Sequence, residues 1–147
     1  MRPVFVMIVG CGRVGSAIAR RMLEEGHEVS VLDEDPEAIA QLEKGIEGTW
    51  VDAGGSFTVG TALEMDALEE AGIERADAFV ASTDGDNTNL VIAQIAQRRF
   101  NTKTVVVRVL DPARATWYEQ QGLRTVCPTK IAIEMLDEAV REGLGVG

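Results

Sequence analysis

The chain has few of the residues from which covalent cross-links or metal sites are built. Its 147 residues include two cysteines and a single histidine. Cys11 and Cys127 lie far apart in the sequence, so we expect no disulfide framework. One histidine and two distant cysteines do not have the spacing of metal ligands either.

Basic residues and long apolar runs are also scarce. There are 14 Lys and Arg against 24 Asp and Glu, which gives a formal charge of −10. A nucleic-acid surface needs clustered Lys and Arg to displace counterions, so we expect no nucleic-acid binding and interpret the charge as favouring solubility. The apolar run 4–9 is too short for a signal-peptide core or a membrane span. The expected compartment is the cytoplasm, with membrane contact only through a partner.

Short apolar runs alternate with amphipathic segments along most of the chain. The runs predict strands at 4–9, 28–32, 57–59, 78–82, 104–109 and 125–127. The amphipathic segments predict helices at 13–25, 36–44, 65–71, 86–98 and 112–121. Gly26, Gly72 and Gly122 fall just past predicted helix ends. We predict an α/β fold with a Rossmann-like, doubly wound parallel sheet of six strands.

The last segment differs from the rest. We predict one helix over 129–142, with apolar residues such as Ile131, Met135 and Val140 at helical spacing. Taken alone, this stripe has two open interpretations: it packs back on the same sheet, or it contacts a second copy of the chain. We therefore divide the chain into a unit at 1–128 and a helical unit at 129–147.

The strongest local motif is the glycine-rich turn Gly10-Cys11-Gly12-Arg13-Val14-Gly15 between the first strand and the first helix. In such a turn Gly10 permits the tight bend, Gly12 allows a phosphate close to the backbone, and Gly15 allows close helix–strand packing. The helix N-terminus supplies free N–H donors and the positive end of a dipole. The motif predicts binding of the phosphates of an adenine nucleotide.

Two charged positions indicate which nucleotide the turn would bind. Asp33 lies just past the second predicted strand, 18 residues after Gly15, where an acidic residue accepts hydrogen bonds from a ribose. Together with Glu34 and Asp35 it would repel a 2′-phosphate, which favours NAD over NADP; the simpler alternative is that Asp33 only starts a turn. Arg13 would weaken the helix dipole unless an anion compensates, so it indicates a di- or triphosphate, or else is merely solvated.

Further blocks of sequence carry a family resemblance. After Asp33 they are 60–62 (Gly-Thr-Ala), 68–73 (Leu-Glu-Glu-Ala-Gly-Ile), 76–84, 87–90, 106–109 and 127–129. With the glycine turn, they make nearly the whole chain resemble the N-terminal lobe of the RCK domain, also called KTN or TrkA-N. Members of that family are cytosolic regulators of potassium channels and of Trk/Ktr-type potassium transporters.

The resemblance implies a role for each block. Residues 10–15, Cys11 and Val14 among them, would hold the phosphates, with Asp33 and Glu34 at the ribose. Thr61 and Ala62 would line the adenine side, and Thr83 and Asp84 would lie near the second half of a dinucleotide. Arg108 would reach the nucleotide or a partner subunit. Helix capping by Thr83 and Asp84, and a plain ion pair for Arg108, are the alternatives.

The chain departs from the family pattern in two places. Residues 49–56 are interpreted as an insertion before the third strand, and Asp52-Ala53 there imitates part of the family's Gly-Asp-Ala block. The distance to residues 71–73 favours 60–62 as the true equivalent, with Thr61 in place of the acidic residue. The family's C-terminal lobe is absent, which implies a truncated piece or a short protein that works beside another subunit.

The resemblance implies a regulator and not an enzyme. NAD(H) or ATP/ADP would act as the regulatory ligand, and an integral-membrane potassium transporter or channel subunit would be the partner at the inner face of the cell membrane. The 129–142 helix would mediate a dimer, and an octameric ring is the larger assembly considered. The alternative is an NAD-dependent oxidoreductase domain, but His27 follows a helix end away from the expected ligand.

Overall fold

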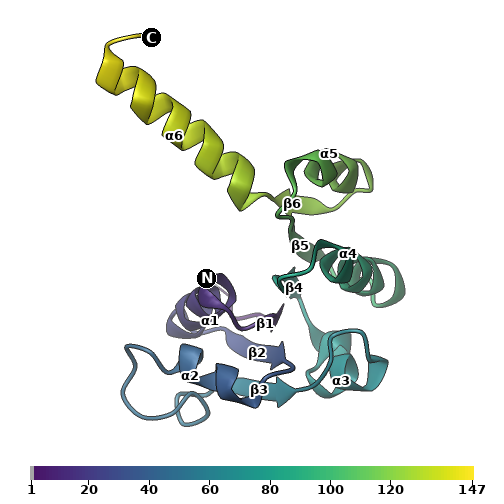
Figure 1. Cartoon of the computed structure of the whole chain (residues 1–147). Coiled ribbons are helices and arrows are strands. Elements are labelled where there is room, and N and C mark those ends of the chain that lie inside the picture. The colour runs from purple at the N-terminus through teal and green to yellow at the C-terminus, as the bar shows by residue number, and fades with distance from the viewer. Residues whose placement is uncertain (1) are drawn as a thin grey trace.

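The computed structural model describes residues 2–147, so residue 1 of the predicted unit 1–128 lies outside it. A six-stranded sheet runs through the molecule in the order β3-β2-β1-β4-β5-β6, and every neighbouring pair is parallel (Figure 1). The strands are β1 (Phe5–Val9), β2 (Glu28–Asp33), β3 (Ser56–Val59), β4 (Ala78–Ala81), β5 (Thr104–Arg108) and β6 (Arg124–Val126). The order reverses between β1 and β4, which is where doubly wound sheets bind ligands.

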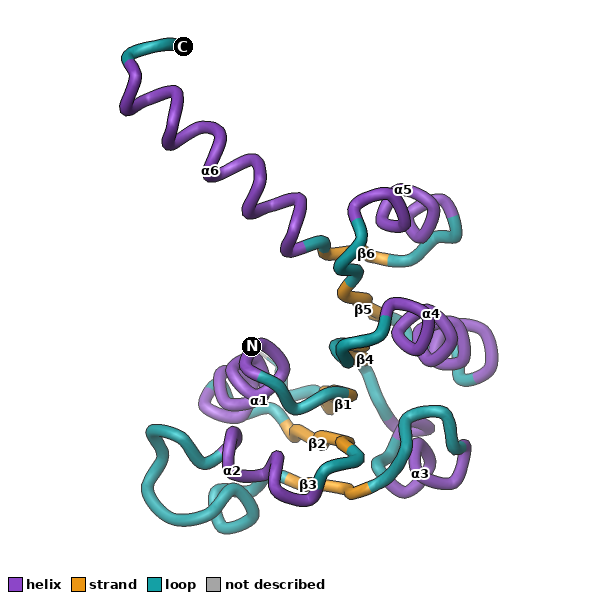
Figure 2. The backbone as a smooth tube through the Cα atoms, viewed as in Figure 1, coloured by secondary structure: helices purple, strands orange, loops and turns teal. Residues whose placement is uncertain are grey.

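Helices cover both faces of the sheet (Figure 2). The α-helices are α1 (Arg13–Glu24), α2 (Ile39–Leu42), α3 (Met65–Glu70), α4 (Asp86–Gln94), α5 (Pro112–Gln120) and α6 (Pro128–Leu144). Two 3-10 turns, η1 (Pro36–Ala38) and η2 (Ile73–Arg75), and one π-type turn, η3 (Ile95–Arg99), complete the helical elements. In Figures 1 and 2, α1 and α2 lie on one side of the sheet, and α3, α4 and α5 lie on the other.

Alternation along β1 builds the two halves of the core. Phe5, Met7 and Val9 pack with buried residues of α3, α4 and α5, whereas Val6 and Ile8 pack with α1 and α2. All five side chains are buried, as expected for a central parallel strand whose two faces are both covered. The Val-rich, non-alternating runs of the sequence therefore predicted the sheet for the right physical reason.

The predicted α/β fold is confirmed, and most predicted elements agree with the structure to within two residues. The helix predicted over 36–44 is wrong in detail. Asp35 accepts a hydrogen bond from the Glu37 N–H at 2.9 Å, which starts the 3-10 turn η1, and only α2 follows as true α-helix. The helix predicted over 86–98 changes to a wider π-type turn after Gln94.

Residues 49–56, interpreted from sequence as an insertion, contain a core residue. Trp50 is fully buried against the α1 side of the sheet. Its backbone N–H donates to the Glu43 carboxylate at 2.8 Å, and its indole N–H donates to the Ser56 carbonyl at 3.0 Å. The ring lies so close to Gly55 that a Cβ there would be 2.1 Å from it. The segment is therefore anchored to the core before β3 begins.

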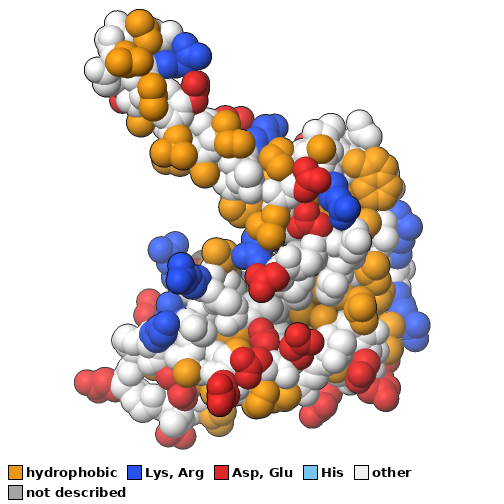
Figure 3. Space-filling view, viewed as in Figure 1, with side chains coloured by type: hydrophobic (Ala, Val, Ile, Leu, Met, Phe, Trp, Pro, Cys, Tyr) orange, Lys and Arg blue, Asp and Glu red, His pale blue; other side chains and the backbone are white. Residues whose placement is uncertain are grey.

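The C-terminal helix α6 projects away from the rest of the molecule (Figure 1). None of its residues is buried, and its hydrophobic side chains run along the projecting rod in the space-filling view (Figure 3). The exposed apolar residues of this segment are Ile131, Ile133, Met135, Leu136, Val140, Leu144 and Val146. In this structure α6 does not pack on the chain's own sheet, and contact with a second copy of the chain stays a prediction.

Candidate functional site

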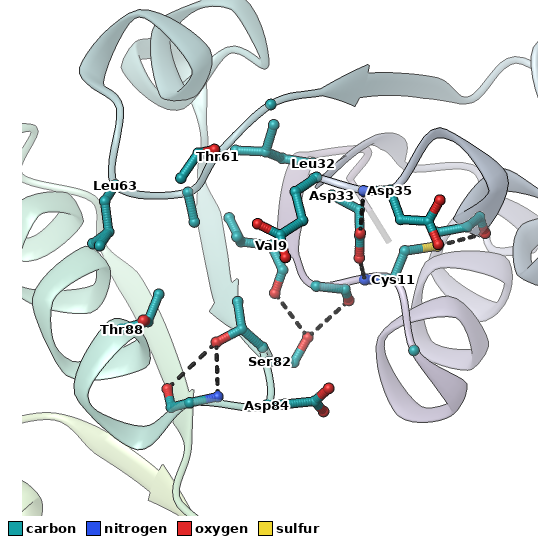
Figure 4. Close-up of a pocket in the computed structure, with 18 of the residues that line it drawn as sticks. Val9, Cys11, Leu32, Asp33, Asp35, Thr61, Leu63, Ser82, Asp84 and Thr88 are labelled. Atoms are coloured by element: carbon teal, nitrogen blue, oxygen red, sulfur yellow. Dashed lines mark hydrogen bonds between the residues drawn. The ribbon is translucent and has the colours of Figure 1, made fainter.

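A cavity of about 710 Å³ opens at the carboxyl ends of the central strands. Four loops line it, and each follows a different parallel strand. Their lining residues are 9–12 after β1, 32–35 with 37, 38 and 41 after β2, 60–63 after β3, and 82–85 with 88 after β4. The close-up in Figure 4 shows side chains from these separate loops around one space.

The glycine turn packs against the end of β4. Gly10 has φ +102°, and a Cβ there would lie 2.5 Å from the Ser82 carbonyl oxygen. A Cβ on Gly15 would lie 2.0 Å from the Gly10 carbonyl oxygen. The Ser82 hydroxyl donates to the carbonyls of Val9 and Gly10, at 3.0 and 3.2 Å. Gly10 and Gly15 thus provide the tight bend and the close helix–strand approach.

Gly12 differs from these two glycines because it faces open space. A Cβ built on Gly12 would meet no atom within 4 Å. Gly12 is the N-cap of α1, no side chain caps this end, and the first turn has no acidic residue. The first backbone N–H groups of a helix have no partner within the helix, and they form an anion site together with the dipole. The space at Gly12 therefore fits a phosphate group.

Asp33 connects the glycine turn to the loop after β2. Its Oδ2 accepts a hydrogen bond from the Cys11 N–H at 2.7 Å, and its Oδ1 accepts one from the Asp35 N–H at 2.9 Å. Both contacts are drawn in Figure 4. Each carboxylate oxygen keeps a further lone pair for a ribose hydroxyl. Glu34, Asp35 and Glu37 also line the cavity, so this end carries four carboxylates.

The loop after β3 supplies the opposite wall. Gly60, Thr61 and Ala62 line the cavity, whereas Asp52 and Ala53 do not. Leu63 follows them and is 55% exposed at the edge of the same cavity. The hydroxyl of Thr61 and the apolar side chains of Ala62 and Leu63 form a surface suited to the flat face and polar edge of a base.

The loop after β4 is held by a network of hydrogen bonds. Thr83 donates through its N–H and its hydroxyl to the Asn89 side-chain oxygen, at 2.9 and 2.6 Å. The Arg108 guanidinium donates to the Ser82 and Thr83 carbonyls at 3.0 and 2.7 Å, and its Nη2 lies 3.4 Å from Asp84. Thr83 and Asp84 line the cavity, whereas Arg108 is not a lining residue and contacts this loop through the Ser82 and Thr83 carbonyls.

The cavity brings together most, but not all, of the residues chosen from sequence. Gly10, Cys11, Gly12, Asp33, Glu34, Thr61, Ala62, Thr83 and Asp84 line it. Arg13, Val14, Gly15 and Arg108 do not line it. Sequence reasoning did not single out the lining residues Glu37, Ala38, Gln41, Leu63, Gly85 and Thr88. These lie in the loops and helices that follow β2, β3 and β4, and no residue-type pattern marked them.

Cys11 is a lining residue with a buried thiol. Its Sγ donates to the Ala38 carbonyl at 3.3 Å, and the residue is 2% exposed. Burial, and next the negative charge of Asp33, raise the pKa of the Cys11 thiol to about 12. The thiol is therefore protonated at neutral pH and is not a nucleophile there.

The described residues provide neither a cluster of metal ligands nor a membrane-spanning helix, and no histidine lines the cavity. Over residues 2–147, no group of three or more His, Cys, Asp or Glu side chains is arranged to hold a metal ion. No described helix has the length and hydrophobicity that would carry it across a membrane. His27 is buried at the amino end of β2, where its Nδ1 accepts a hydrogen bond from the Val4 N–H at 3.2 Å. That is the end of the sheet opposite the cavity.

One cavity is lined by a glycine turn, by an acidic residue at the end of β2 and by the loop after β4. This arrangement agrees with a family comparison. The model of the TrkA-N domain matches residues 6–129. The chain belongs to the TrkA-N domain family. Residues 6–129 comprise the sheet except its first residue and reach the start of α6, so the TrkA-N match includes every loop of the cavity.

Relatives of this TrkA-N domain include longer proteins. The chain is 38% identical over 139 residues to the Trk system potassium uptake protein TrkA of Streptomyces coelicolor, covering 94% of this chain and 59% of that protein. It is 30% identical over 118 residues to a TrkA homolog of Pyrococcus abyssi, covering 80% of this chain and 48% of that protein. The chain thus spans about half the length of these curated relatives.

Solved structures agree with the fold. The Kef CTD of Shewanella denitrificans in its AMP-bound form has a TM-score of 0.73 and 26% identity, over 92% of this chain and 79% of that one. GsuK bound to ADP has a TM-score of 0.76 over 95% of this TrkA-N domain and 34% of that chain. Its identity is 18%, so this second likeness bears on the fold alone.

Proposed function

We propose that the chain binds an adenine nucleotide, NAD(H) or ATP/ADP, and acts as a regulatory unit of a Trk-type potassium uptake system. The single observation that carries the proposal is the open space at Gly12. It lies at the uncapped N-terminus of α1, next to the carboxylate of Asp33. A phosphate and a ribose fit these two features in the order in which a nucleotide joins them.

The relatives support the transporter part of the proposal. The Streptomyces relative carries the name of a Trk system potassium uptake protein, and the Shewanella Kef structure contains AMP. We infer that an integral-membrane potassium transporter or channel subunit is the partner and that the chain acts on the inner face of the membrane. The ligand would work by binding one arrangement of the assembly more tightly than another.

Self-association is the second part of the proposal. The face of β4–β6 opposite α4 and α5 is incompletely covered: Val80 and Val106 are half-buried, and Val126 is 44% exposed. α6 exposes its apolar residues at the same edge of the sheet. An exposed apolar face of this kind marks an interaction surface. A dimer in which α6 of one copy covers the other copy would bury both surfaces, and an octameric ring could be built from such dimers.

We propose sensing and not catalysis as the purpose of the cavity. Its titratable lining residues are carboxylates and the Cys11 thiol, and the thiol is protonated at neutral pH. An oxidoreductase needs a group that exchanges protons near the nicotinamide, most often histidine. His27 lies at the other end of the sheet.

Calorimetric titration of the chain with NAD, NADH, NADP, ATP, ADP and AMP tests the proposal directly. We expect at least one nucleotide without a 2′-phosphate to bind and to raise the unfolding temperature, because a ligand that binds only the folded state stabilises it. If none of the six binds, the proposal is wrong. If the chain oxidises or reduces its bound nicotinamide with a small substrate, the oxidoreductase alternative replaces it.

A further inference from the structure

The start of α4 connects the cavity to the helix that projects from the molecule. We propose that Asp86 is a positioning residue that couples nucleotide occupancy to the root of α6. The inference deepens the proposed function and rests on it, because it requires a nucleotide in the cavity. Asp86 does not line the cavity, so its role would be transmission and not ligand contact.

The first link joins the cavity to Asp86. Thr83, Asp84 and Gly85 line the cavity after β4, and Asp86 follows them directly as the first residue of α4. The bonds from Thr83 to Asn89, one turn into α4, hold this loop to the helix. A ligand that displaces 83–85 therefore also displaces the Asp86 backbone and side chain.

The second link joins Asp86 to the next loop along the sheet. Its carboxylate accepts hydrogen bonds from the N–H groups of Leu110 and Asp111, at 2.8 and 3.1 Å. Its carbonyl accepts one from the Tyr118 hydroxyl at 2.7 Å. Hydrogen bonds to an ionised carboxylate are stronger than neutral ones. One residue thus contacts both the loop after β5 and the last turn of α5.

The third link reaches α6. The Val109 N–H donates to the Val126 carbonyl at 3.0 Å, and the Cys127 thiol makes a weak contact of 3.9 Å with the Leu110 carbonyl. Cys127 is buried and is the N-cap of α6. The Leu110 residue therefore bonds Asp86 through its N–H and meets the cap of α6 through its carbonyl. A shift of Asp86 changes the support of the first turn of α6.

The loop also has a reason to respond to a ligand. Asp84 is fully exposed beside the cavity, 3.4 Å from the Arg108 guanidinium. The phosphate of a nucleotide repels the Asp84 carboxylate and attracts the Arg108 guanidinium. A ligand that reaches 83–85 therefore weakens the interaction between Asp84 and Arg108. A dinucleotide that spans the cavity from Asp33 to Thr83 should act in this way. AMP, which is one half of NAD, should occupy the Asp33 end and leave the loop unchanged.

Hydrogen exchange of backbone amides, measured with and without saturating NAD or AMP, tests the coupling in the full chain. The variant is Asp86→Asn, because an amide accepts only one of the two N–H bonds and turns its own donors toward the other. The matched control is Asp66→Asn, which makes the same charge change at an exposed residue in the first turn of α3, outside the cavity. Calorimetry reports the NAD affinity of each protein.

We expect NAD to slow exchange at residues 110–111 and 127–131 about fivefold or more in the wild-type chain and in Asp66→Asn, and AMP to have little effect there. In Asp86→Asn, NAD should bind within about threefold of the wild-type affinity but leave 127–131 unprotected. If Asp86→Asn does not fold, Tyr118→Phe removes the third bond more gently and should reduce the protection in part.

Two results would overturn the coupling alone: NAD binds without protecting 127–131 in the wild-type chain, or it protects them equally in the folded Asp86 and Tyr118 variants. A chain that binds none of the nucleotides would instead overturn the proposed function, and the coupling with it. The calorimetric titration separates these cases before any exchange is measured.

Discussion

The substitution Gly12→Ala separates ligand binding from folding. Gly12 has φ −84° and ψ −161°, a conformation open to alanine, and its added methyl would meet no atom within 4 Å. The methyl would instead occupy the space at the N-terminus of α1 that we assign to a phosphate. The variant therefore tests the assignment without disturbing the packing of the protein.

The expected magnitudes follow from these contacts. Alanine is a poorer N-cap than glycine, which destabilises the folded protein, but it also lowers the conformational entropy of the unfolded chain, which stabilises the fold. Because these two effects act in opposite directions, the free energy of unfolding should change by less than about 1 kcal/mol. That corresponds to a shift in Tm of about 4 °C or less for a domain of this size. A hydrogen bond to a charged group contributes about 1.5–3 kcal/mol, so blocking one phosphate contact should weaken Kd roughly 10- to 100-fold.

Calorimetry for Kd and thermal unfolding for Tm measure the two effects on the same sample. Gly15→Ala is the contrasting variant, because its methyl would lie 2.0 Å from the Gly10 carbonyl oxygen and 2.9 Å from the Ser82 hydroxyl. Overpacking of this kind should cost about 1–3 kcal/mol or more and lower Tm. If Gly12→Ala folds normally and binds nucleotide within a factor of about two of wild type, no phosphate lies at Gly12 and the reasoning fails.

Four further outcomes are expected. In calorimetry, Asp33→Asn should weaken NAD binding and narrow the preference for NAD over NADP, and an unchanged preference would exclude Asp33 from the ribose site. In iodoacetamide labelling at pH 8, a pKa of about 12 in place of 9.0 lowers the thiolate fraction of Cys11 about a thousandfold. Labelling in the folded chain should therefore be slow, should accelerate as pH rises, and should become fast on denaturation. In ultracentrifugation, Leu136→Asp should weaken self-association about 30-fold or more. Lys130→Gln makes an equal charge change on the same helix and should leave self-association unchanged. If both variants have equal effects, the exposed apolar residues of α6 are not the interface. Because carboxylates surround the cavity, higher salt should strengthen ATP binding more than NAD binding, and stronger ATP binding at low salt would contradict this view of its electrostatics.

The central strands were predictable because they are short, apolar runs buried on both faces. β1 shows the effect most clearly, since all five of its residues are apolar and buried, and four of the six residues of β2 are buried as well. The glycine turn and Asp33 were predictable because their backbone geometry requires specific residue types at a fixed spacing. The family resemblance then directed attention to Thr61 and to Thr83, both of which line the cavity.

What the sequence did not reveal depends on contacts between distant segments. Trp50 in a Gly-rich segment resembled a loop residue, but its ring fills the core beside Gly55. The resemblance placed Arg108 at the nucleotide or at a partner subunit, with an ion pair as the alternative; only the structure shows that its guanidinium donates to the Ser82 and Thr83 carbonyls and lies 3.4 Å from Asp84. Asp86 resembled an ordinary helix start, and only its bonds to the Leu110 and Asp111 amides indicate another purpose.

The charges of the cavity bear on which nucleotide it favours. Among the lining groups, positive potential comes from the N-terminus of α1, which acts only over a short distance, and the Arg108 guanidinium outside the lining already donates to the Ser82 and Thr83 carbonyls. Asp33, Glu34, Asp35 and Glu37 line one end of the cavity and Asp84 lines the other. A bridging pyrophosphate near the helix end gains from the dipole while its two ribose groups meet the carboxylates as hydrogen-bond acceptors. A terminal triphosphate carries more charge toward Asp84 and needs a cation that the lining residues do not supply. We therefore predict that one copy alone binds NAD(H) more tightly than ATP. Tighter binding of ATP would require a positive group from outside the lining residues, for which Arg13 is the nearest candidate along the turn.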